Sequence, residues 1–361
     1  MLVSALAIPS FPRTLSPSPS SAIAKSANIL SFFLAPTRAG IRAGPSDGAP
    51  EMMPSSPPRE LHARVEEYVE YFTTDGRELL QGWLDRSAIY YPMMRAVFRG
   101  KNLPEDLAYI AMIESGFNPH AVSEADATGP WQFVDSTAKQ YGLRMDAWVD
   151  ERRDPVKSTR AAAEHLHDLH NRFGSWSLAL ASYNAGALRV QQAVQKAQSK
   201  DFWTLLAAGY IPRETRNYVP KYLASVIIAS APVAYGFSLP SGDPFTYEEI
   251  AVPNSTDLGL IALFANTTVK HIKRLNPELR RGSTPPDMAP YVLRLPKGAN
   301  QALFFAALFE NRASLGAGRG TGSLLPFENK LSTLTANQAN VLRTLLHTYR
   351  QPLHSLVIGR L

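Results

Sequence analysis

The chain has 361 residues, of which 45% are hydrophobic and 19% are charged. This length allows for two or three domains, and the composition is that of a globular protein rather than of a disordered one. The formal net charge of +6 suits an anionic polymer, either nucleic acid or cell-wall polysaccharide, without selecting one of them. Because the sequence has no cysteine, it excludes disulfides, thiolate catalysis, cysteine zinc sites and a cysteine-linked lipid anchor in this chain.

Residues 1–58 are rich in Ser, Pro, Ala and Gly, which predicts a disordered leader or an atypical export segment. Either of two short apolar runs, MLVSALAI at the start and the one that follows Lys25, would make a poor export signal. Both runs fall well short of the roughly 18 residues that a membrane span needs. We therefore expect no stable membrane span there, and both interpretations of the segment stay open.

Residues 59–238 have apolar side chains at helical spacing and few strand signals, which predicts one mostly helical domain. The sequence predicts Ser158 as the N-cap of one helix and Gly174 as its stop. Helical spacing also resumes in WQFVDSTAKQYG, at 131–142. The longer helices are expected at 59–72, 77–100, 158–174, 176–198 and 213–236.

The pattern changes beyond Pro240. Two short strands, YEEIAVP and YVLRLP, enclose two short helices, which predicts a βααβ module at 245–297. Residues 298–361 are expected to be partly helical, at 300–315 and 335–350, and we assign them no role.

The segment LPEDLAYIAMIES begins with a proline and two acids, a favoured helix start. Leu107, Ile110, Ala111 and Glu114 then fall on one helical face, so the carboxyl of Glu114 continues an apolar stripe. Burial and the negative end of the helix dipole would both favour the protonated carboxyl, as a general acid at neutral pH requires. The alternative is an ordinary glutamate at a helix end that points to water.

Turn-forming residues follow in NPHAVSEADATGP, at 118–130, which predicts an irregular loop near the end of this helix. Ser123, Gln132 and backbone amides would line a cleft beside the acid, suited to the hydroxyl and acetamido groups of a sugar chain. Trp131 is predicted to be a core residue rather than a platform for a sugar ring. Ser115 has two open interpretations, a structural cap or a donor to the glutamate.

Four blocks in order resemble the soluble lytic transglycosylase (SLT) domain, in particular that of the membrane-bound murein transglycosylase D type. They are ESGFNPHAVS at 114–123, ATGPWQF at 127–133, ALASYNAG at 179–186 and RETRNYVPKYLA at 213–224. The resemblance covers about residues 60–238.

This resemblance implies a mainly α, lysozyme-like fold of the goose type. The implied activity is non-hydrolytic cleavage of the β-1,4 bond between N-acetylmuramic acid (MurNAc) and N-acetylglucosamine (GlcNAc) in peptidoglycan, which leaves 1,6-anhydroMurNAc ends. It implies that Glu114 acts first as general acid and then as base. It also implies that five other residues bind the saccharide: Ser123, Gln132, Tyr183, Asn184 and Tyr218. Tyr183 and Tyr218 are the ones expected to touch the acetamido group or the glutamate.

No metal or cofactor is implied, and the expected partner is the peptidoglycan glycan strand rather than nucleic acid. We expect a monomer that works in the periplasm or cell envelope. Two alternatives stay open, a goose-type lysozyme-like hydrolase and a peptidoglycan-binding protein without catalysis.

Two other motifs have ordinary interpretations. In EHLHDLH, at 164–170, His167 and His170 share a helical face with Glu164, but the zinc motif with two His four residues apart around a Glu is absent. We therefore expect no metal site there. The acids of DERRDP, at 150–155, are predicted to lie in a solvated, salt-bridged turn.

The βααβ module resembles a LysM domain, a family that binds GlcNAc-containing glycan. Asn254, Ser255 and Thr256 stand where that family usually has Gly-Asp-Thr, and an insert at 280–290 precedes the last strand. A glycan binder and a degenerate structural cap are both open interpretations.

Overall fold

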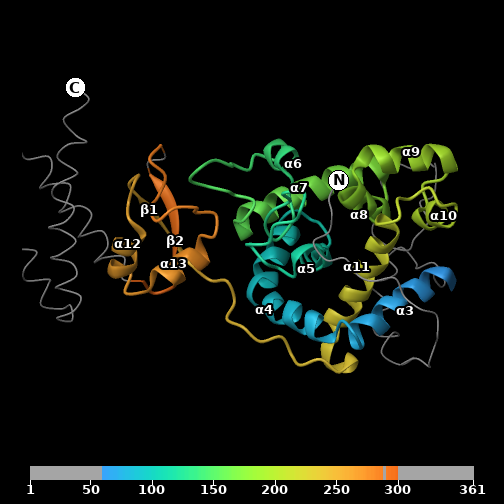
Figure 1. Ribbon diagram of the computed structural model, residues 1–361, viewed down its shortest axis with the longest axis horizontal. Helices are drawn as coiled ribbons and strands as arrows, with labels where there is room; N and C mark the ends of the chain where they lie inside the picture. Colours follow the sequence, from blue (N-terminus) through green and yellow to red (C-terminus); the bar gives the residue numbers. More distant parts are fainter. Residues whose placement is uncertain (1–58, 288–289, 300–361) are drawn as a thin grey trace, which may run out of the picture. The chain divides into compact units, whose positions relative to one another are not determined.

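The computed structural model describes residues 59–287 and 290–299. These residues form two compact units (Figure 1). The first unit contains the residues up to Asp146 and Asp150–Phe245. The second contains Ala147–Val149 and the residues from Thr246 onwards. The predicted leader at 1–58 and the predicted helices at 300–315 and 335–350 lie outside the described residues.

Helices form the first unit, which confirms the predicted mainly α fold. The predicted ends of the first two helices agree with the structure to within a residue. In chain order the helices are α3 (Arg59–Thr73), α4 (Arg77–Gly100), the 3-10 helix η1 (Glu105–Tyr109), α5 (Ile110–Ser115), α6 (Asp135–Gln140), α7 (Pro155–Phe173), α8 (Trp176–Ala185), α9 (Ala187–Ala197), α10 (Phe202–Ala207), α11 (Thr215–Ser230) and the 3-10 helix η2 (Pro232–Tyr235).

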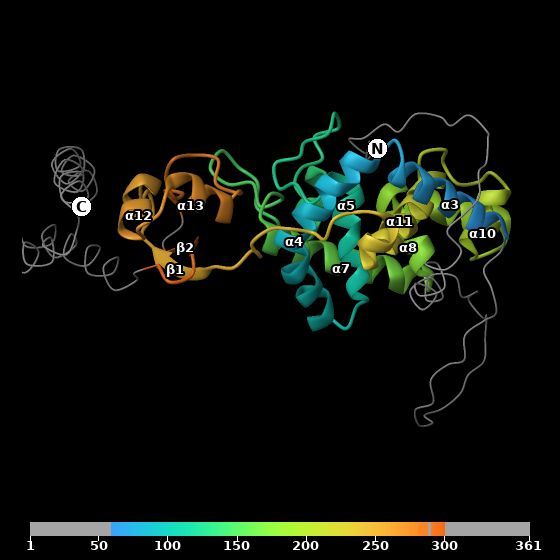
Figure 2. The same cartoon turned by 90° about the horizontal axis from the view of Figure 1, so that it is seen from below.

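Helix α11 is the buried centre of this unit. It contacts α3, α5 and α8, and both views draw it beside α3 (Figures 1 and 2). Every residue from Tyr218 to Ile228 is buried, as expected for a helix that is surrounded by other helices. Polar side chains on α11 are therefore enclosed by protein.

The predicted start of α7 is wrong. The N-cap is Asp154, whose Oδ1 accepts hydrogen bonds from the backbone N–H groups of Val156 and Lys157, at 2.8 and 2.9 Å. Pro155 occupies the first turn, where its missing N–H costs nothing. Ser158 lies inside the helix, and its hydroxyl donates to the carbonyl of Asp154 at 2.6 Å. The predicted stop at Gly174 is confirmed.

Three predicted helices are shorter than expected. The one predicted at 213–236 contains α11, which ends at Ser230, and then the separate η2. The run at 176–198 is broken at Gly186, whose φ of 87° and ψ of 140° fall outside the helical region and favour glycine. The helical stretch predicted at 131–142 contains only α6, because Phe133 pairs with Thr128 in an isolated β-bridge and Gln132 has a φ of 49°.

The acids of DERRDP are buried, so the prediction of a solvated turn is wrong. Asp150 is 3% exposed and accepts hydrogen bonds from Nε and Nη2 of Arg152, both at 2.9 Å. The other terminal nitrogen of Arg152 donates to the carbonyls of Asp126 and Phe133, at 2.8 and 3.3 Å. This bidentate ion pair offsets the cost of desolvating the Asp150 carboxylate. Through its carbonyl contacts, Arg152 also holds the loop that follows α5 in place.

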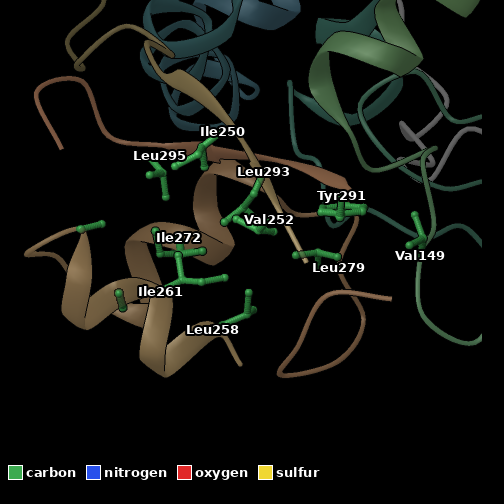
Figure 3. Packing of buried hydrophobic residues seen from close by; sticks show 12 residues of the cluster. Val149, Ile250, Val252, Leu258, Ile261, Ile272, Leu279, Tyr291, Leu293 and Leu295 are labelled. Carbon is green, nitrogen blue, oxygen red and sulfur yellow. The ribbon is translucent and has the colours of Figure 1, made fainter. Parts of the chain in front are cut away.

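The second unit has the predicted βααβ order. Strands β1 (Glu248–Val252) and β2 (Tyr291–Leu295) are antiparallel, with Ile250 opposite Leu293. Helices α12 (Leu258–Phe264) and α13 (Val269–Leu275) lie between them in the chain. Side chains of the sheet and the helices form one buried apolar cluster that also includes Val149 (Figure 3).

The glycine at the centre of the loop after α5 gives a test of this architecture. A Cβ at Gly129, which has a φ of +85°, would lie 1.9 Å from the backbone oxygen of Arg152. Gly142 has a similar φ of +74° and nothing within 4 Å of its Cβ position. We expect Gly142→Ala to lower the free energy of unfolding by about 1 kcal/mol through backbone strain alone. Gly129→Ala should lose about 2 kcal/mol more, because the backbone must move.

Urea unfolding of the two variants and the parent measures this difference. Equal losses at the two glycines would contradict the close packing of the loop against Arg152.

Candidate active site

Glu114 lies in the last turn of α5 and is 2% exposed. Leu107, Ile110 and Ala111 on the same face are fully buried, which confirms the predicted apolar stripe. The first half of the predicted helix is the 3-10 helix η1, so α5 itself is short. The carboxyl is therefore enclosed, and does not point to water.

Glycine ends α5 directly after this turn. Gly116 has a φ of 60° and is the C-cap of α5. A Cβ at this position would lie 2.3 Å from Cδ1 of Trp83, a residue of α4. The chain therefore turns away after Ser115, and only glycine fits at position 116 without displacing the ring of Trp83.

Tyr218, on α11, contacts the carboxyl of Glu114 directly. Its phenol O–H donates to Oε1 of Glu114 at 2.6 Å. This bond confirms the prediction that Tyr218 touches the glutamate, across 104 residues of sequence. Burial raises the pKa of the Tyr218 phenol well above its usual value, so the phenol is a hydrogen-bond donor at neutral pH.

Desolvation raises the pKa of Glu114 from an ordinary value of 4.5 to about 7. The hydrogen bond from Tyr218 and the charge of Lys221 act in the opposite direction, whereas the charge of Glu214 adds to the increase. The pKa shift has the predicted direction, and its largest cause is burial. A carboxyl with this pKa can both give and accept a proton near neutral pH.

Tyr183 and Asn184, on α8, bind other parts of the protein. The phenol of Tyr183 donates to the backbone carbonyl of Trp131 at 2.8 Å, and Oδ1 of Asn184 accepts from the hydroxyl of Thr215 at 2.8 Å. Both side chains are buried. They connect α8 to the loop and to the start of α11, and their contact with saccharide stays a prediction.

The loop residues predicted to bind saccharide are also buried. The Ser123 hydroxyl accepts from the N–H of Ala127 at 3.0 Å, which holds the loop tip. Nε2 of Gln132 donates to the carbonyl of Gly129 at 2.9 Å, and its Oε1 is buried without a hydrogen-bond partner among the described residues. This open acceptor fits a site that receives an N–H or O–H from a ligand. The saccharide roles of both residues stay predictions.

Two neighbouring residues have structural roles. Trp131 is completely buried and its Nε1 donates to the hydroxyl of Thr159 at 2.9 Å, which confirms that it is a core residue. The Ser115 hydroxyl bonds backbone groups, among them the carbonyl of Pro130 at 2.9 Å. Of its two open interpretations, the structural one is supported.

The sequence reasoning missed Lys221. Its side chain is buried, and its ammonium donates to the carbonyl of Ile113 at 3.3 Å, next to Glu114 in the chain. Burial lowers the pKa of Lys221 to about 8, against the opposing effect of Glu114. One signal was available, because Lys221 follows Tyr218 by three residues in the block RETRNYVPKYLA and so shares its helical face.

The described residues contain no group of three or more His, Asp and Glu side chains that is placed to hold a metal ion. The ring of His165 packs 5.2 Å from the ring of Tyr183, and His170 stacks on Trp176 at 4.0 Å. Within the same residues, the helices are too short or too polar to cross a lipid bilayer.

The pKa of Glu114 predicts how stability depends on pH. A raised pKa in the folded state stabilises the fold below pH 4.5, and that contribution is lost as the pH rises through 7. Between pH 4.5 and 8 the parent should therefore lose up to about 3 kcal/mol of unfolding free energy relative to Glu114→Gln. Urea unfolding of both proteins across this pH range measures the difference.

Glu105 serves as a control of opposite sign. Hydrogen bonds from Arg99 and Arg95 lower the pKa of Glu105 to about 2, so its contribution is present above pH 4.5 and is lost as the pH falls towards 2. Glu105→Gln should therefore be less stable than the parent at neutral pH and approach it in acid. A Glu114→Gln variant whose stability relative to the parent does not change with pH would contradict the burial of Glu114 as a protonated acid.

Comparison with known families gives two matches. The family described as "Transglycosylase SLT domain" matches residues 95–206, and the family described as "Lytic transglycosylase MltD, LysM-like domain" matches residues 246–304. The first match contains Glu114, Gln132, Tyr183 and Asn184, and the second contains the βααβ elements.

Similar proteins include membrane-bound lytic murein transglycosylase D of Escherichia coli (strain K12), which is 34% identical over 218 residues. That alignment covers 59% of this chain and 47% of the relative, so the chain spans about half the length of this relative. A protein of Alteromonas sp. (strain M-1) named for tributyltin chloride resistance is 35% identical over 150 residues, which cover 37% of this chain and 72% of that protein.

Among solved structures, the 70 kDa soluble lytic transglycosylase of Escherichia coli matches with 22% identity and a TM-score of 0.36. The match covers 48% of this chain and 32% of that one. The first family match contains three of the four blocks described above, and the second contains the elements of the βααβ module. The chain therefore belongs to the lytic murein transglycosylases, as a member that joins a transglycosylase SLT domain to the LysM-like domain of the type D proteins.

Proposed function

We propose that this chain cleaves the MurNAc-β-1,4-GlcNAc bond of peptidoglycan without water and leaves 1,6-anhydroMurNAc ends. Glu114 carries the proton in both steps. The observation that supports this most directly is the buried carboxyl of Glu114, which lies within the SLT match, has a pKa of about 7 and accepts a hydrogen bond from the phenol of Tyr218 at 2.6 Å.

In the first step the protonated Glu114 gives its proton to the glycosidic oxygen. The C1–O bond breaks, and GlcNAc leaves with a free hydroxyl. Tyr218 stabilises the resulting carboxylate because its O–H donates to the oxygen that gains charge. The acetamido oxygen of the substrate stabilises the positive charge at C1, in the place of the second carboxylate that many glycosidases use.

In the second step the Glu114 carboxylate accepts the proton of the muramoyl C6 hydroxyl. The C6 oxygen attacks C1 and closes the 1,6-anhydro ring, so the proton that Glu114 gave is regained and no water is consumed. One group serves both steps because its pKa lies near the working pH.

Glycan recognition is proposed for the buried polar groups around Glu114. Oε1 of Gln132 has no partner among the described residues, so it is an acceptor for a sugar hydroxyl or acetamido N–H. Three other residues are proposed to touch the sugar: Ser123, Tyr183 and Asn184. Each already makes one hydrogen bond within the protein, but hydroxyl and amide groups can make more than one.

We assign the catalytic domain to residues 59–238 and the LysM-like module to 245–297. The relative from Escherichia coli is named as membrane-bound, and a peptidoglycan substrate would put the reaction in the cell envelope.

Pelleting of the full chain with insoluble peptidoglycan, before and after proteolytic removal of the LysM-like module, decides whether the module adds affinity for glycan.

Product analysis tests the reaction. Purified chain added to peptidoglycan should release muropeptides with anhydro ends, lighter by one water than hydrolytic products. Glu114→Gln should lower the release rate by at least about 100-fold, because a general acid contributes that much or more. Glu124→Gln, the same change at an exposed position of the neighbouring loop, is the matched control and should keep parental activity.

Three outcomes would contradict the proposal. Reducing ends would show a goose-type lysozyme-like hydrolase, which uses water in the second step. Binding to peptidoglycan without products would show an adaptor that has lost catalysis. Parental activity in Glu114→Gln would show that another group is the acid.

A further inference from the structure

Lys221 lies one turn beyond Tyr218 on α11, and its side chain is buried with the residue 7% exposed. Its ammonium donates to the carbonyl of Ile113 at 3.3 Å and lies 5.6 Å from the centre of the Trp83 ring. One face of α11 thus presents a phenol to the Glu114 carboxyl and a cation to the peptide group beside it.

A second cation binds the same helix end. Nε of Arg86, on α4, donates to the carbonyl of Gly116 at 2.5 Å. The last carbonyls of a helix lack partners within the helix and carry partial negative charge. Lys221 and Arg86 therefore both bind the carbonyl end of α5, from two different helices.

Burial of a lysine needs a reason, because an enclosed ammonium loses its hydration. The carbonyl of Ile113 and the Trp83 ring compensate only part of that loss, since both are neutral. A neutral amide of similar length would make the hydrogen bond to the carbonyl at a lower desolvation cost. We therefore infer that the positive charge of Lys221 does more than bind the carbonyl of Ile113. The ionisable group on which this charge acts is Glu114.

Few charged groups act on Glu114 among the described residues. Helix α11 contributes the Tyr218 phenol and the Lys221 ammonium, and Glu214 at its N-cap adds a like charge. The Tyr183 phenol faces it from α8, and both phenols are neutral because burial raises their pKa. Arg86, from α4, binds the carbonyl two residues further along. Lys221 is thus the cation among the groups that shift the pKa of Glu114.

We propose that Lys221 is a positioning residue for Glu114, whose ammonium fixes the last turn of α5 and stabilises the carboxylate that remains once Glu114 has given up its proton. This inference deepens the proposed reaction and rests on it. Tyr218 stabilises the same carboxylate by a direct hydrogen bond, and Lys221 does so by its charge. Without that charge the carboxyl holds its proton more tightly and is a weaker acid towards the glycosidic oxygen.

Three substitutions in the full chain separate the effect of the positive charge of Lys221 from the effect of its hydrogen bond to the carbonyl of Ile113. Lys221→Met removes both, Lys221→Gln removes the charge and keeps an N–H donor, and Lys221→Arg keeps both. Lys139→Met is the matched control, because Lys139 is an exposed lysine of α6 that pairs with Asp135. Thermal unfolding of each variant reports whether it folds, and Lys221→Gln decides the question if Lys221→Met does not fold.

The first readout is the titration of the Glu114 carboxyl carbon by NMR, identified by its loss in Glu114→Gln. We expect the midpoint to rise by about one pH unit in Lys221→Met and Lys221→Gln, since the nearby positive charge is gone. It should return towards the parental value in Lys221→Arg and remain parental in Lys139→Met. An unchanged midpoint in the folded Met and Gln variants would overturn the proposal and leave Lys221 as a cap alone.

The second readout is the pH profile of muropeptide release. Its alkaline limb should move upward with the midpoint in Lys221→Met and Lys221→Gln, and the maximal rate should fall about tenfold. A fall in rate without any movement of the limb would overturn the charge role. The titration needs no activity, so it tests Lys221 even if product analysis were to refute the transglycosylase reaction.

Discussion

The structure of the site depends on one carboxyl that is kept out of water. Glu114 is 2% exposed, and desolvation is the largest cause of its raised pKa. A buried carboxyl without partners would stay protonated over the whole neutral range. The hydrogen bond from Tyr218 and the charge of Lys221 limit that effect and hold the pKa at about 7. The balance between burial and these two partners makes the group able to give and regain a proton.

Several distant segments maintain this balance. Helix α11 supplies Tyr218 and Lys221. Helix α4 supplies Trp83 and Arg86, which contact the turn at the end of α5. Helix α8 holds the loop that follows α5 through the hydrogen bond of Tyr183. Arg152 fixes the far side of the same loop, through a buried ion pair and two carbonyl contacts. Among the predicted site residues, Gln132 has a buried Oε1 with no hydrogen-bond partner in the part of the chain that the structure describes. A site preorganised in this way needs little rearrangement when charge develops.

The sequence predicted what depends on periodicity and local signals. The face with Leu107, Ile110 and Glu114, the core position of Trp131 and the βααβ order are confirmed. The predictions were wrong where contacts between residues, rather than local spacing, determine the structure. Of the buried acids of DERRDP, Asp150 pairs with Arg152 of the same motif. Arg152 also donates to the carbonyls of Phe133 and Asp126, 19 and 26 residues away in the sequence, and spacing does not predict these contacts. The break at Gly186 and the cap at Asp154 depend on backbone geometry that spacing alone does not specify. Lys221 was missed because a lysine on a helix is usually solvated, although its spacing from Tyr218 places both on one helical face. The packing of α11 shows its burial.

The most direct test of this account is a crystal structure of Glu114→Gln, with its catalytic acid disabled, in complex with a MurNAc-GlcNAc oligosaccharide. The account predicts the oxygen of one MurNAc-GlcNAc bond within about 2.6–3.2 Å of the side-chain amide at position 114, the reach of a general acid. It also predicts a sugar hydroxyl or acetamido group on Oε1 of Gln132. A saccharide bound with every glycosidic oxygen beyond hydrogen-bond reach of residue 114, directly or through one water, would contradict the central role of Glu114.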